Sequence, residues 1–254
     1  MERIGEDRVP VRLFGLIGYP LSHSFSQRYF QEKFEREGLT ECRYELFPLP
    51  NLGGLPALLA AHPELEGLNV TIPHKVGVMA LLDAVDAEAA AVGAVNVIRV
   101  TEGKLTGYNS DVSGFRDSLL DLLGGDRPER ALVLGTGGAS RAVVHVLAHL
   151  GIPYTLVSRN AGQGVADYRS VDAGVLAAHR LVINTTPLGM HPSTDTCPDL
   201  AYDAFTPAHY AFDLVYNPSL TRFLAQAATG GARIRNGLDM LYGQAARAWQ
   251  LFQR

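Results

Sequence analysis

Cysteine is scarce in this chain, and the two cysteines lie far apart. Cys42 and Cys197 form no CxxC pattern. Small disulfide-stabilised domains carry dense, even-numbered cysteine patterns, so that class of protein is excluded. We therefore expect two free thiols in a reducing compartment.

Clusters of positive charge are also missing. The 254 residues carry 22 Lys and Arg against 26 Asp and Glu, a net charge of -4, and Lys and Arg nowhere form a cluster. A protein that binds a phosphate backbone needs a basic patch or stripe. Nucleic acid is therefore not expected as a partner.

Long apolar runs are absent as well. Residues 1–8 are rich in charge, and no later stretch has the length of a signal-peptide core or a membrane span. The sequence therefore predicts a cytoplasmic protein that has no membrane partner.

A metal-binding pattern is not recognisable either. His145 and His149 stand at i and i+4 of an expected helix, a spacing that can hold a metal ion. No Glu stands beside His145, and no third ligand follows at a familiar distance. We expect the pair to lie on a helix face and the protein to bind no metal.

What the chain does contain is an alternation of short apolar runs and helical segments. Hydrophobic residues make up 47% of the sequence, enough for a large core and two domains. The alternation is typical of an α/β architecture. In the first block we expect strands at 11–17, 42–47 and 68–72, helices at 25–36 and 86–92, and a hairpin from 95–100 to 105.

The second block follows 124–128, whose Gly-Gly-Asp-Arg-Pro sequence resembles a linker. Continuous apolar runs at 131–134, 154–157, 181–183 and 211–215 indicate buried parallel strands. From Leu238 the apolar residues recur at helical spacing, and this last helix can pack on either block.

A glycine-rich turn between a predicted strand and a predicted helix indicates dinucleotide binding. It spans Gly135 to Arg141, where Gly135 permits the tight turn and Gly137 lets the backbone approach a pyrophosphate. The helix that begins near Gly138 offers unpaired N–H groups to the anion. Ser140 stands where the third glycine of the fingerprint is usual.

The end of the next predicted strand bears on the choice of cofactor. NAD-binding folds place an acidic residue there for the ribose 2′-hydroxyl, whereas this strand ends in Ser158-Arg159. An Arg can pair with a 2′-phosphate, which favours NADP over NAD. An ordinary surface position for Arg159 is the alternative, since no further basic residue occurs before Arg169.

Lys75 and Asp111 suggest the chemistry. A ketone that receives a hydride becomes an alkoxide, which a cationic Lys within hydrogen-bond reach can protonate while an Asp orients that Lys. A Lys or an Asp taken alone is usually a solvated surface charge. The nucleotide turn further along the chain favours the catalytic interpretation.

Taken in order, the motifs of this chain resemble those of the shikimate dehydrogenase family over nearly the whole sequence. They are 18–26, 69–75, 93–96, Asp111, 135–141, 158–159, 184–190, 213–218 and 236–244. The resemblance implies a substrate-binding domain at 1–111, an NADP-binding Rossmann domain at 112–237, and a final helix, 238–254, that packs back on the first. It also implies NADP(H)-dependent, reversible reduction of 3-dehydroshikimate to shikimate.

The same resemblance assigns roles to single residues. Lys75 and Asp111 fall on the catalytic pair. The substrate-binding positions are Ser24, Ser26, Thr71, Asn96, Tyr216 and Gln244. The cofactor-binding positions are Gly135, Thr136, Gly137, Gly138, Ala139, Ser158, Arg159, Thr185, Leu214 and Gly237.

The chain also departs from the common family pattern. Gln27 stands where a Pro is frequent, and Val112-Ser-Gly114 follows Asp111 where a Gly is frequent. Three alternatives stay open: an enzyme that also uses quinate or NAD, a regulatory module that binds cofactor without turnover, and a dinucleotide-binding redox sensor. The oligomeric state, monomer or homodimer, cannot be read from the sequence.

Overall fold

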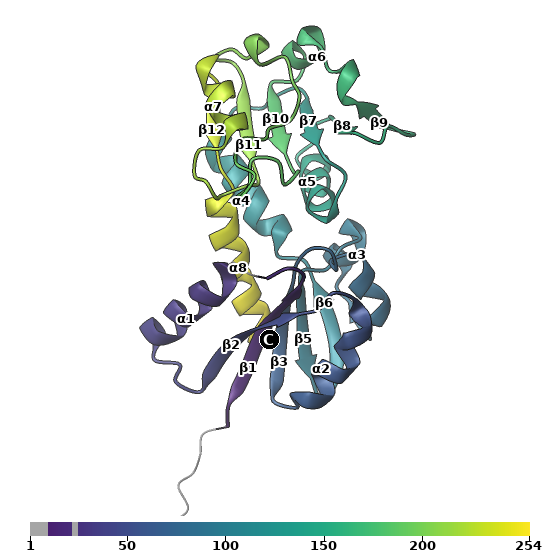
Figure 1. Ribbon diagram of the computed structural model, residues 1–254, viewed down its shortest axis with the longest axis vertical. Coiled ribbons are helices and arrows are strands. Elements are labelled where there is room, and N and C mark those ends of the chain that lie inside the picture. The colour runs from purple at the N-terminus through teal and green to yellow at the C-terminus, as the bar shows by residue number, and fades with distance from the viewer. Residues whose placement is uncertain (1–9, 22–24) are drawn as a thin grey trace, which may run out of the picture. The chain divides into compact units, whose positions relative to one another are not determined.

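The computed structural model describes residues 10–21 and 25–254, which form two compact units (Figure 1). The first unit joins the described residues up to Ala90 with Ala94–Asn109 and Ala248–Arg254. The second unit comprises Ala91–Gly93 and Ser110–Arg247. The functional domain limits given above, 1–111 with 238–254 and 112–237, stay a prediction. Ser24 lies outside the described residues.

The first unit contains a mixed sheet with the strand order β2-β1-β3-β5-β6-β4. Its strands are β1 (Arg12–Gly18), β2 (Cys42–Pro48), β3 (Leu65–Val70), β4 (Ala84–Val85), β5 (Val97–Thr101) and β6 (Lys104–Tyr108). β1 runs parallel to β2 and β3, whereas β5 runs antiparallel to β3. The carboxyl ends of β1 and β3 therefore share one end of the sheet with the start of β5. We call it the carboxyl end of the first sheet.

Helices cover the two faces of this sheet and supply its two apolar cores. They are α1 (Phe25–Glu37), α2 (Leu55–Ala61) and α3 (Ala87–Val92), with the 3₁₀ turns η1 (Leu52–Gly54) and η2 (Gly77–Leu81). In one core Phe14 and Phe30 pack with Leu251 and Phe252, at the end of α8 (Leu238–Phe252). A side chain at Gly67 would collide with the Phe252 ring, so glycine there admits the helix. The predicted return of the C-terminal helix to the first domain holds for its end, since Ala248–Arg254 belongs to the first unit while residues 238–247 belong to the second.

The second unit contains a parallel sheet with the strand order β12-β11-β10-β7-β8-β9. Its strands are β7 (Ala131–Leu134), β8 (Tyr154–Ser158), β9 (Val165–Asp167), β10 (Leu181–Asn184), β11 (Tyr210–Asp213) and β12 (Arg233–Arg235). The five pairings between them are all parallel. The order matches the doubly wound nucleotide-binding sheet, in which the direction of winding reverses between β7 and β10. The predicted α/β class with a Rossmann-type domain is confirmed.

The helices of the second unit are α4 (Asp111–Leu123), α5 (Gly138–His149), α6 (Ala173–Ala177) and α7 (Arg222–Thr229), with the turns η3 (Tyr168–Ser170) and η4 (Tyr202–Ala204). The apolar residues of β7, β10 and β11 are buried between them. Continuous burial explains why these strands could be predicted from unbroken apolar runs.

Three details differ from the sequence-based expectation. The strand predicted at 211–215 ends at Asp213. The strand predicted at 68–72 lies at Leu65–Val70, since the chain turns directly after Val70. The segment 124–128, predicted as a linker, is a turn inside the second unit, because α4 precedes it there and ends at Gly124 with φ +57°. No sequence pattern predicted α2, α4, α6, α7 and the short strands β4, β9 and β12.

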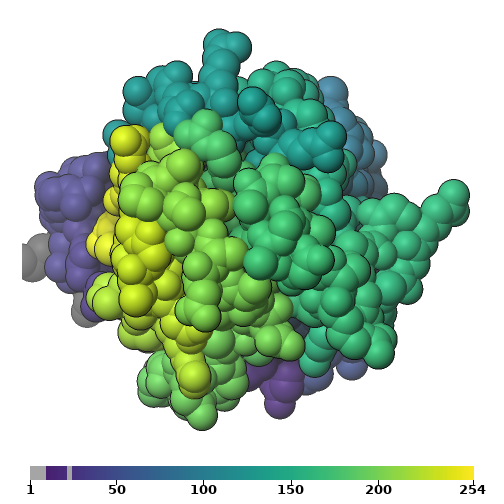
Figure 2. Space-filling model, turned by 90° about the horizontal axis from the view of Figure 1, so that it is seen from above, coloured from purple at the N-terminus to yellow at the C-terminus, as the bar shows by residue number. Residues whose placement is uncertain are grey.

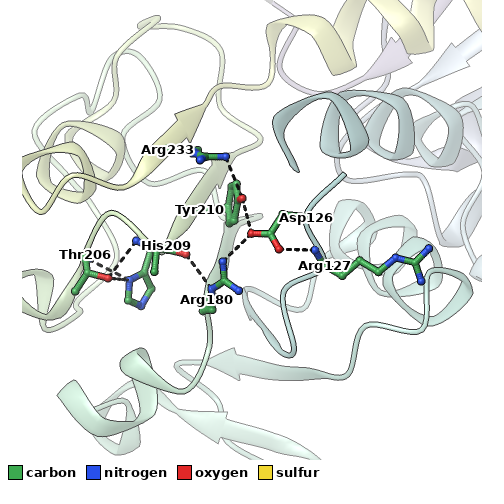
Figure 3. A network of polar contacts seen from close by, with 8 residues as sticks. Asp126, Arg127, Arg180, Thr206, His209, Tyr210 and Arg233 are labelled. Carbon is green, nitrogen blue, oxygen red and sulfur yellow. Dashed lines mark hydrogen bonds and ion pairs between the residues drawn. The ribbon is translucent and has the colours of Figure 1, made fainter. Parts of the chain in front are cut away.

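The turn after α4 is tied to the amino ends of β10 and β11 by a polar cluster around Asp126 (Figure 3). Arg180 Nη2 and the Tyr210 hydroxyl donate to Asp126 Oδ2 at 2.7 and 2.8 Å. The Arg127 N–H donates to Asp126 Oδ1 at 2.7 Å, and Arg233 donates to the Tyr210 oxygen at 3.2 Å. We call these contacts the Asp126 network. The pKa of Asp126 lies below its ordinary value because Tyr210, the Arg127 N–H and Arg180 stabilise the carboxylate.

Candidate active site

Lys75 lies in the turn that follows β3, at the carboxyl end of the first sheet. Backbone bonds fix this turn: Thr71 N donates to Ile17 O at 2.9 Å, and Val95 N donates to Lys75 O at 2.7 Å. The Lys75 side chain is half-buried. A half-buried ammonium beside strand ends is well placed to meet a small anionic ligand, as sequence analysis expects.

Two residues within the motifs 18–26 and 69–75, to which no site role was assigned, support the Lys75 turn. His74 is buried, and its Nε2 lies 2.6 Å from the carbonyl oxygen of Leu49, just beyond β2. Gly18, at the end of β1, has no room for a side chain because a Cβ atom there would collide with Thr71 Cγ2. Thr71, half-buried, therefore sits directly against the end of β1.

Asn96 lies at the same end of this sheet, one residue before β5. It is 3% exposed, and its backbone joins both neighbouring strands. Its N–H donates to Tyr108 O at 3.0 Å, and its carbonyl oxygen accepts from Val70 N at 2.9 Å. The topology thus brings Thr71, Lys75 and Asn96 to one end of one sheet.

Ser26 lies in the first turn of α1 and is half-buried. Its hydroxyl is hydrogen-bonded to Tyr44, whose own hydroxyl donates to Asn69 Oδ1 at 2.8 Å. Burial raises the pKa of Tyr44, and the bond from Ser26 opposes that rise. Tyr44 is buried in the aromatic core, with its ring 4.5 Å from that of Phe30. Ser26 is thus hydrogen-bonded to a buried tyrosine that lies outside the motifs named above.

Asp111 is the first residue of α4, in the second unit. It is 2% exposed, although it carries a carboxylate. Unpaired N–H groups at the start of a helix make that position favourable for an anion. Lys75 and Asp111 belong to different units, so their pairing stays a prediction.

The glycine-rich turn lies between β7 and α5, as the fingerprint requires. Gly135 has φ +107°, and a Cβ atom there would lie 2.7 Å from Thr185 Oγ1. Gly137 precedes α5 as its N-cap and provides no side-chain oxygen to cap the first N–H groups of the helix. The N-terminus of α5 therefore fits a pyrophosphate.

Ser140 fits the place of the missing third glycine. It is 3% exposed, and its hydroxyl donates to Gly137 O at 2.7 Å. The side chain thus binds its own turn. Thr136, the remaining predicted residue of this loop, is exposed.

Arg159 follows β8 and is exposed, whereas Ser158 is half-buried. The segment 159–164 is exposed throughout and projects from the surface of this unit (Figure 2). Arg169, the next basic residue along the chain, is paired with Asp167 at 3.0 Å. Arg159 can therefore meet a 2′-phosphate, while Arg169 has a carboxylate partner already.

The remaining predicted residues of the second unit follow β10 and β11 or lie near α8. Thr185 bonds Leu134 O through both its N–H, at 2.9 Å, and its hydroxyl, at 2.7 Å. Leu214 N donates to Asn184 O at 2.9 Å, and Gly237 N donates to Val215 O at 3.2 Å. A Cβ atom at Gly237 would collide with the Leu214 carbonyl, so only glycine permits this approach. Tyr216 and Gln244 are half-buried.

Other features of the described residues complete the description. Cys42 and Cys197 are free thiols. Within residues 10–21 and 25–254, no three His, Cys, Asp or Glu side chains are grouped to hold a metal ion. No helix of the described chain is long and apolar enough to cross a membrane.

Comparison with known proteins gives one consistent picture. A family model described as "Shikimate dehydrogenase substrate binding domain" matches residues 16–98. A protein of Oleidesulfovibrio alaskensis named shikimate dehydrogenase (NADP(+)) is 41% identical over 97% of this chain and 91% of its own length.

Solved structures are similar over almost the same span. Shikimate 5-dehydrogenase from Thermus thermophilus, in complex with NADP(H) and shikimate, has a TM-score of 0.81 at 34% identity and covers 95% of this chain and 93% of its own. Quinate dehydrogenase from Corynebacterium glutamicum, in complex with NAD, has a TM-score of 0.84 at 29% identity, with coverages of 96% and 94%.

Proposed function

The chain belongs to the shikimate dehydrogenase family, and we propose that it catalyses the reversible, NADP-dependent reduction of 3-dehydroshikimate to shikimate. The observation that carries this proposal is the uncapped start of α5, beside Gly135, at the winding reversal of a parallel sheet. That combination fits the pyrophosphate of a dinucleotide. The similar Thermus thermophilus enzyme was solved with NADP(H) and shikimate.

Lys75 is the proposed proton donor in the reductive direction. NADPH, when bound, supplies the hydride to the ketone carbon. As the carbonyl oxygen gains charge, the Lys75 ammonium gives it a proton from Nζ, and the product is an alcohol. In the oxidative direction neutral Lys75 takes that proton back. Asp111 is the proposed partner that orients Lys75.

Neutral side chains hold the substrate in this proposal. Two serine hydroxyls, Ser24 and Ser26, donate to the substrate carboxylate, and hydrogen bonds to an ionised group are about twice as strong as neutral ones. Ser26 is supported by its hydrogen bond with Tyr44. The substrate hydroxyls and ring are assigned to Thr71, Asn96, Tyr216 and Gln244.

A second candidate function is quinate oxidation with NAD. Two observations support this candidate. The chain is similar to a quinate dehydrogenase solved with NAD. In addition, Arg169 is paired with Asp167, so Arg159 is the basic residue that remains at the end of β8 to bind a 2′-phosphate. The paired serines and Arg159 favour shikimate and NADP over this candidate.

The test is an initial-rate comparison of four pairs, shikimate or quinate with NADP⁺ or NAD⁺, followed by nicotinamide absorbance at alkaline pH. The proposal expects the highest kcat/KM for shikimate with NADP⁺. A higher value for quinate with NAD⁺ would establish the second candidate. Binding of NADPH without turnover of either alcohol would indicate a regulatory module.

Small molecules are thus the proposed partners of this chain. A cytoplasmic location and a monomeric or homodimeric state stay predictions.

A further inference from the structure

Asp213 is a buried carboxylate that none of the roles above uses. It is the last residue of β11 and is 0% exposed. Its strand neighbour at the same level is Asn184, the last residue of β10, which is also fully buried. Both therefore lie at the carboxyl end of the second sheet, where the loops predicted to face the cofactor begin.

Three donors from three segments converge on this carboxylate. Asn184 Nδ2 donates to Asp213 Oδ1 at 2.9 Å, and Val215 N donates to the same oxygen at 3.0 Å. The Thr221 hydroxyl, at the start of α7, donates to Asp213 Oδ2 at 2.5 Å. We call these four residues the Asp213 network. It joins the loop after β10, the loop after β11 and the N-terminus of α7.

Asn184 connects Asp213 to the loop after β10. Its Oδ1 accepts from Thr186 N at 3.0 Å and from Thr186 Oγ1 at 2.7 Å. The Thr186 N–H can only donate, which fixes the side of the amide that carries the oxygen, so the NH₂ group must face Asp213. Thr185, the predicted cofactor contact, stands between these two anchored residues.

Val215 connects Asp213 to Gly237, the residue before α8. Its N–H is held by Asp213, and its carbonyl accepts from Gly237 N at 3.2 Å. Gly237 in turn has no room for a side chain because the Leu214 carbonyl packs against it. The two predicted contacts Leu214 and Gly237 are therefore fixed to each other through the residue that Asp213 holds.

A carboxylate suits this place better than its amide counterpart. An ionised Asp only accepts hydrogen bonds, and all three of its neighbours donate. An Asn would direct an NH₂ group toward at least one of these donors, and a buried donor without an acceptor is costly.

Burial raises the pKa of Asp213 to about 6, against the opposing bonds from Thr221, Val215 and Asn184. The group is therefore mostly ionised at neutral pH.

We propose that Asp213 is a positioning residue for the nicotinamide-side loops of the cofactor site, acting through Asn184 on Thr185 and through Val215 on Leu214 and Gly237. This inference rests on the proposed function in one respect, since the ligand of these loops is taken to be NADP(H). Asp213 itself does not touch the ligand.

The test compares two variants that each remove one buried polar interaction from the same sheet. Asp213→Asn disrupts the carboxyl end, and Tyr210→Phe, the matched control, removes a hydroxyl from the Asp126 network at the amino end. NADPH affinity is measured by fluorescence titration, which needs no turnover. KM for NADP⁺, KM for shikimate and kcat are measured in parallel.

The expected result is NADPH binding about tenfold weaker in Asp213→Asn, the scale of one charge-assisted hydrogen bond. KM for NADP⁺ rises in step, while KM for shikimate stays within about twofold. Tyr210→Phe leaves both constants unchanged, although it lowers the melting temperature. A folded Asp213→Asn whose NADPH affinity stays within about twofold of the parent protein would overturn the proposal.

Thr221 keeps the proposal testable if Asp213→Asn does not fold. Thr221→Val removes one of the three donors and is expected to weaken NADPH binding, whereas Thr221→Ser keeps the hydroxyl and restores it. Equal affinities for these two variants would also overturn the proposal. If the parent protein binds NADPH but turns over neither alcohol, the proposed function fails while the role of Asp213 stands on the binding data.

Discussion

The two ends of the parallel sheet differ in how they use polar side chains. At the carboxyl end Asp213, Asn184 and Thr221 are each fully buried, and they hold loops that begin with predicted cofactor contacts. At the amino end Asp126 is paired with Arg180 and accepts a hydrogen bond from the Tyr210 hydroxyl. The side chains of Asp126 and Arg180 are both more than one third exposed to solvent. From this difference we expect one end of the sheet to serve ligand geometry and the other to serve stability.

The first sheet shows the same division. Its carboxyl end holds Thr71, Lys75 and Asn96, whereas its amino end holds an ion pair between Arg12 and Glu66 with an N···O distance of 2.7 Å. Substitutions at the carboxyl ends should therefore change turnover or binding, and substitutions at the amino ends should change stability alone.

The largest effect is expected for Lys75→Ala. Loss of the proton donor should lower kcat about 10²- to 10⁴-fold with little change in KM for shikimate, because the general acid acts mainly in the transition state. The control is Arg12→Gln at the opposite end of this sheet, whose turnover should equal that of the parent protein. Unchanged turnover in Lys75→Ala would remove Lys75 from the mechanism.

Substitutions at the two glycines of the nucleotide turn should have different effects, one on the free energy of unfolding and the other on NADPH affinity. Gly135→Ala forces a side chain to φ +107° and toward Thr185, and we expect it to cost about 1–3 kcal/mol of unfolding free energy. Gly137→Ala meets no atom within 4 Å, so its stability should not fall.

NADPH titration of Gly137→Ala completes this prediction. If the pyrophosphate approaches the backbone there, the added methyl group weakens binding in a protein of full stability. Full affinity for NADPH would show that Gly137 does not border the cofactor.

The carboxyl end should also respond to pH through Asp213. Its folded pKa of about 6 lies above the ordinary Asp value of about 4, so the stability it contributes is complete below about pH 4 and is lost as the pH rises through about 6. The pKa difference corresponds to about 3 kcal/mol. The neighbouring Tyr202 phenol stays neutral in this range because burial raises its pKa.

Urea unfolding between about pH 4 and pH 7 measures this effect. The parent protein should carry the Asp213 contribution, and Asp213→Asn should lack it. Identical pH profiles for the two proteins would contradict the raised pKa.

The smallest effect is expected at the amino end, and it has the opposite sign. The lowered pKa of Asp126 means that its contribution is present above about pH 4 and is lost on further acidification. Asp126→Asn should therefore reduce the melting temperature slightly near neutrality and lose the difference in acid. A change of NADPH affinity in this variant would break the division between the two ends.

Those parts of the molecule whose signals are local could be predicted from the sequence. The strand at Ala131–Leu134, the helix start after Gly137 and the hairpin around Glu102 and Gly103 all follow from neighbouring residues. The place of the 124–128 turn could not be predicted, because the contacts of Asp126 with Arg180 and Tyr210 that tie it to the second unit join residues distant in sequence.

The candidate site divides in the same way. Gly135 and Lys75 could be assigned roles from their motifs, whereas the contacts of Tyr44, His74 and Asp213 depend on partners far along the chain. Asp213 looked like the continuation of an apolar strand to residue 215, but its carboxylate captures the Val215 N–H and ends the strand. Such hydrogen bonds leave no periodicity in the sequence.

The most direct test of the account is the reductive reaction itself, in which purified protein is given NADPH and 3-dehydroshikimate and the products are identified. The account predicts one shikimate formed for each NADPH oxidised, with saturation in both substrates. Folded protein that binds NADPH and forms no shikimate would contradict it.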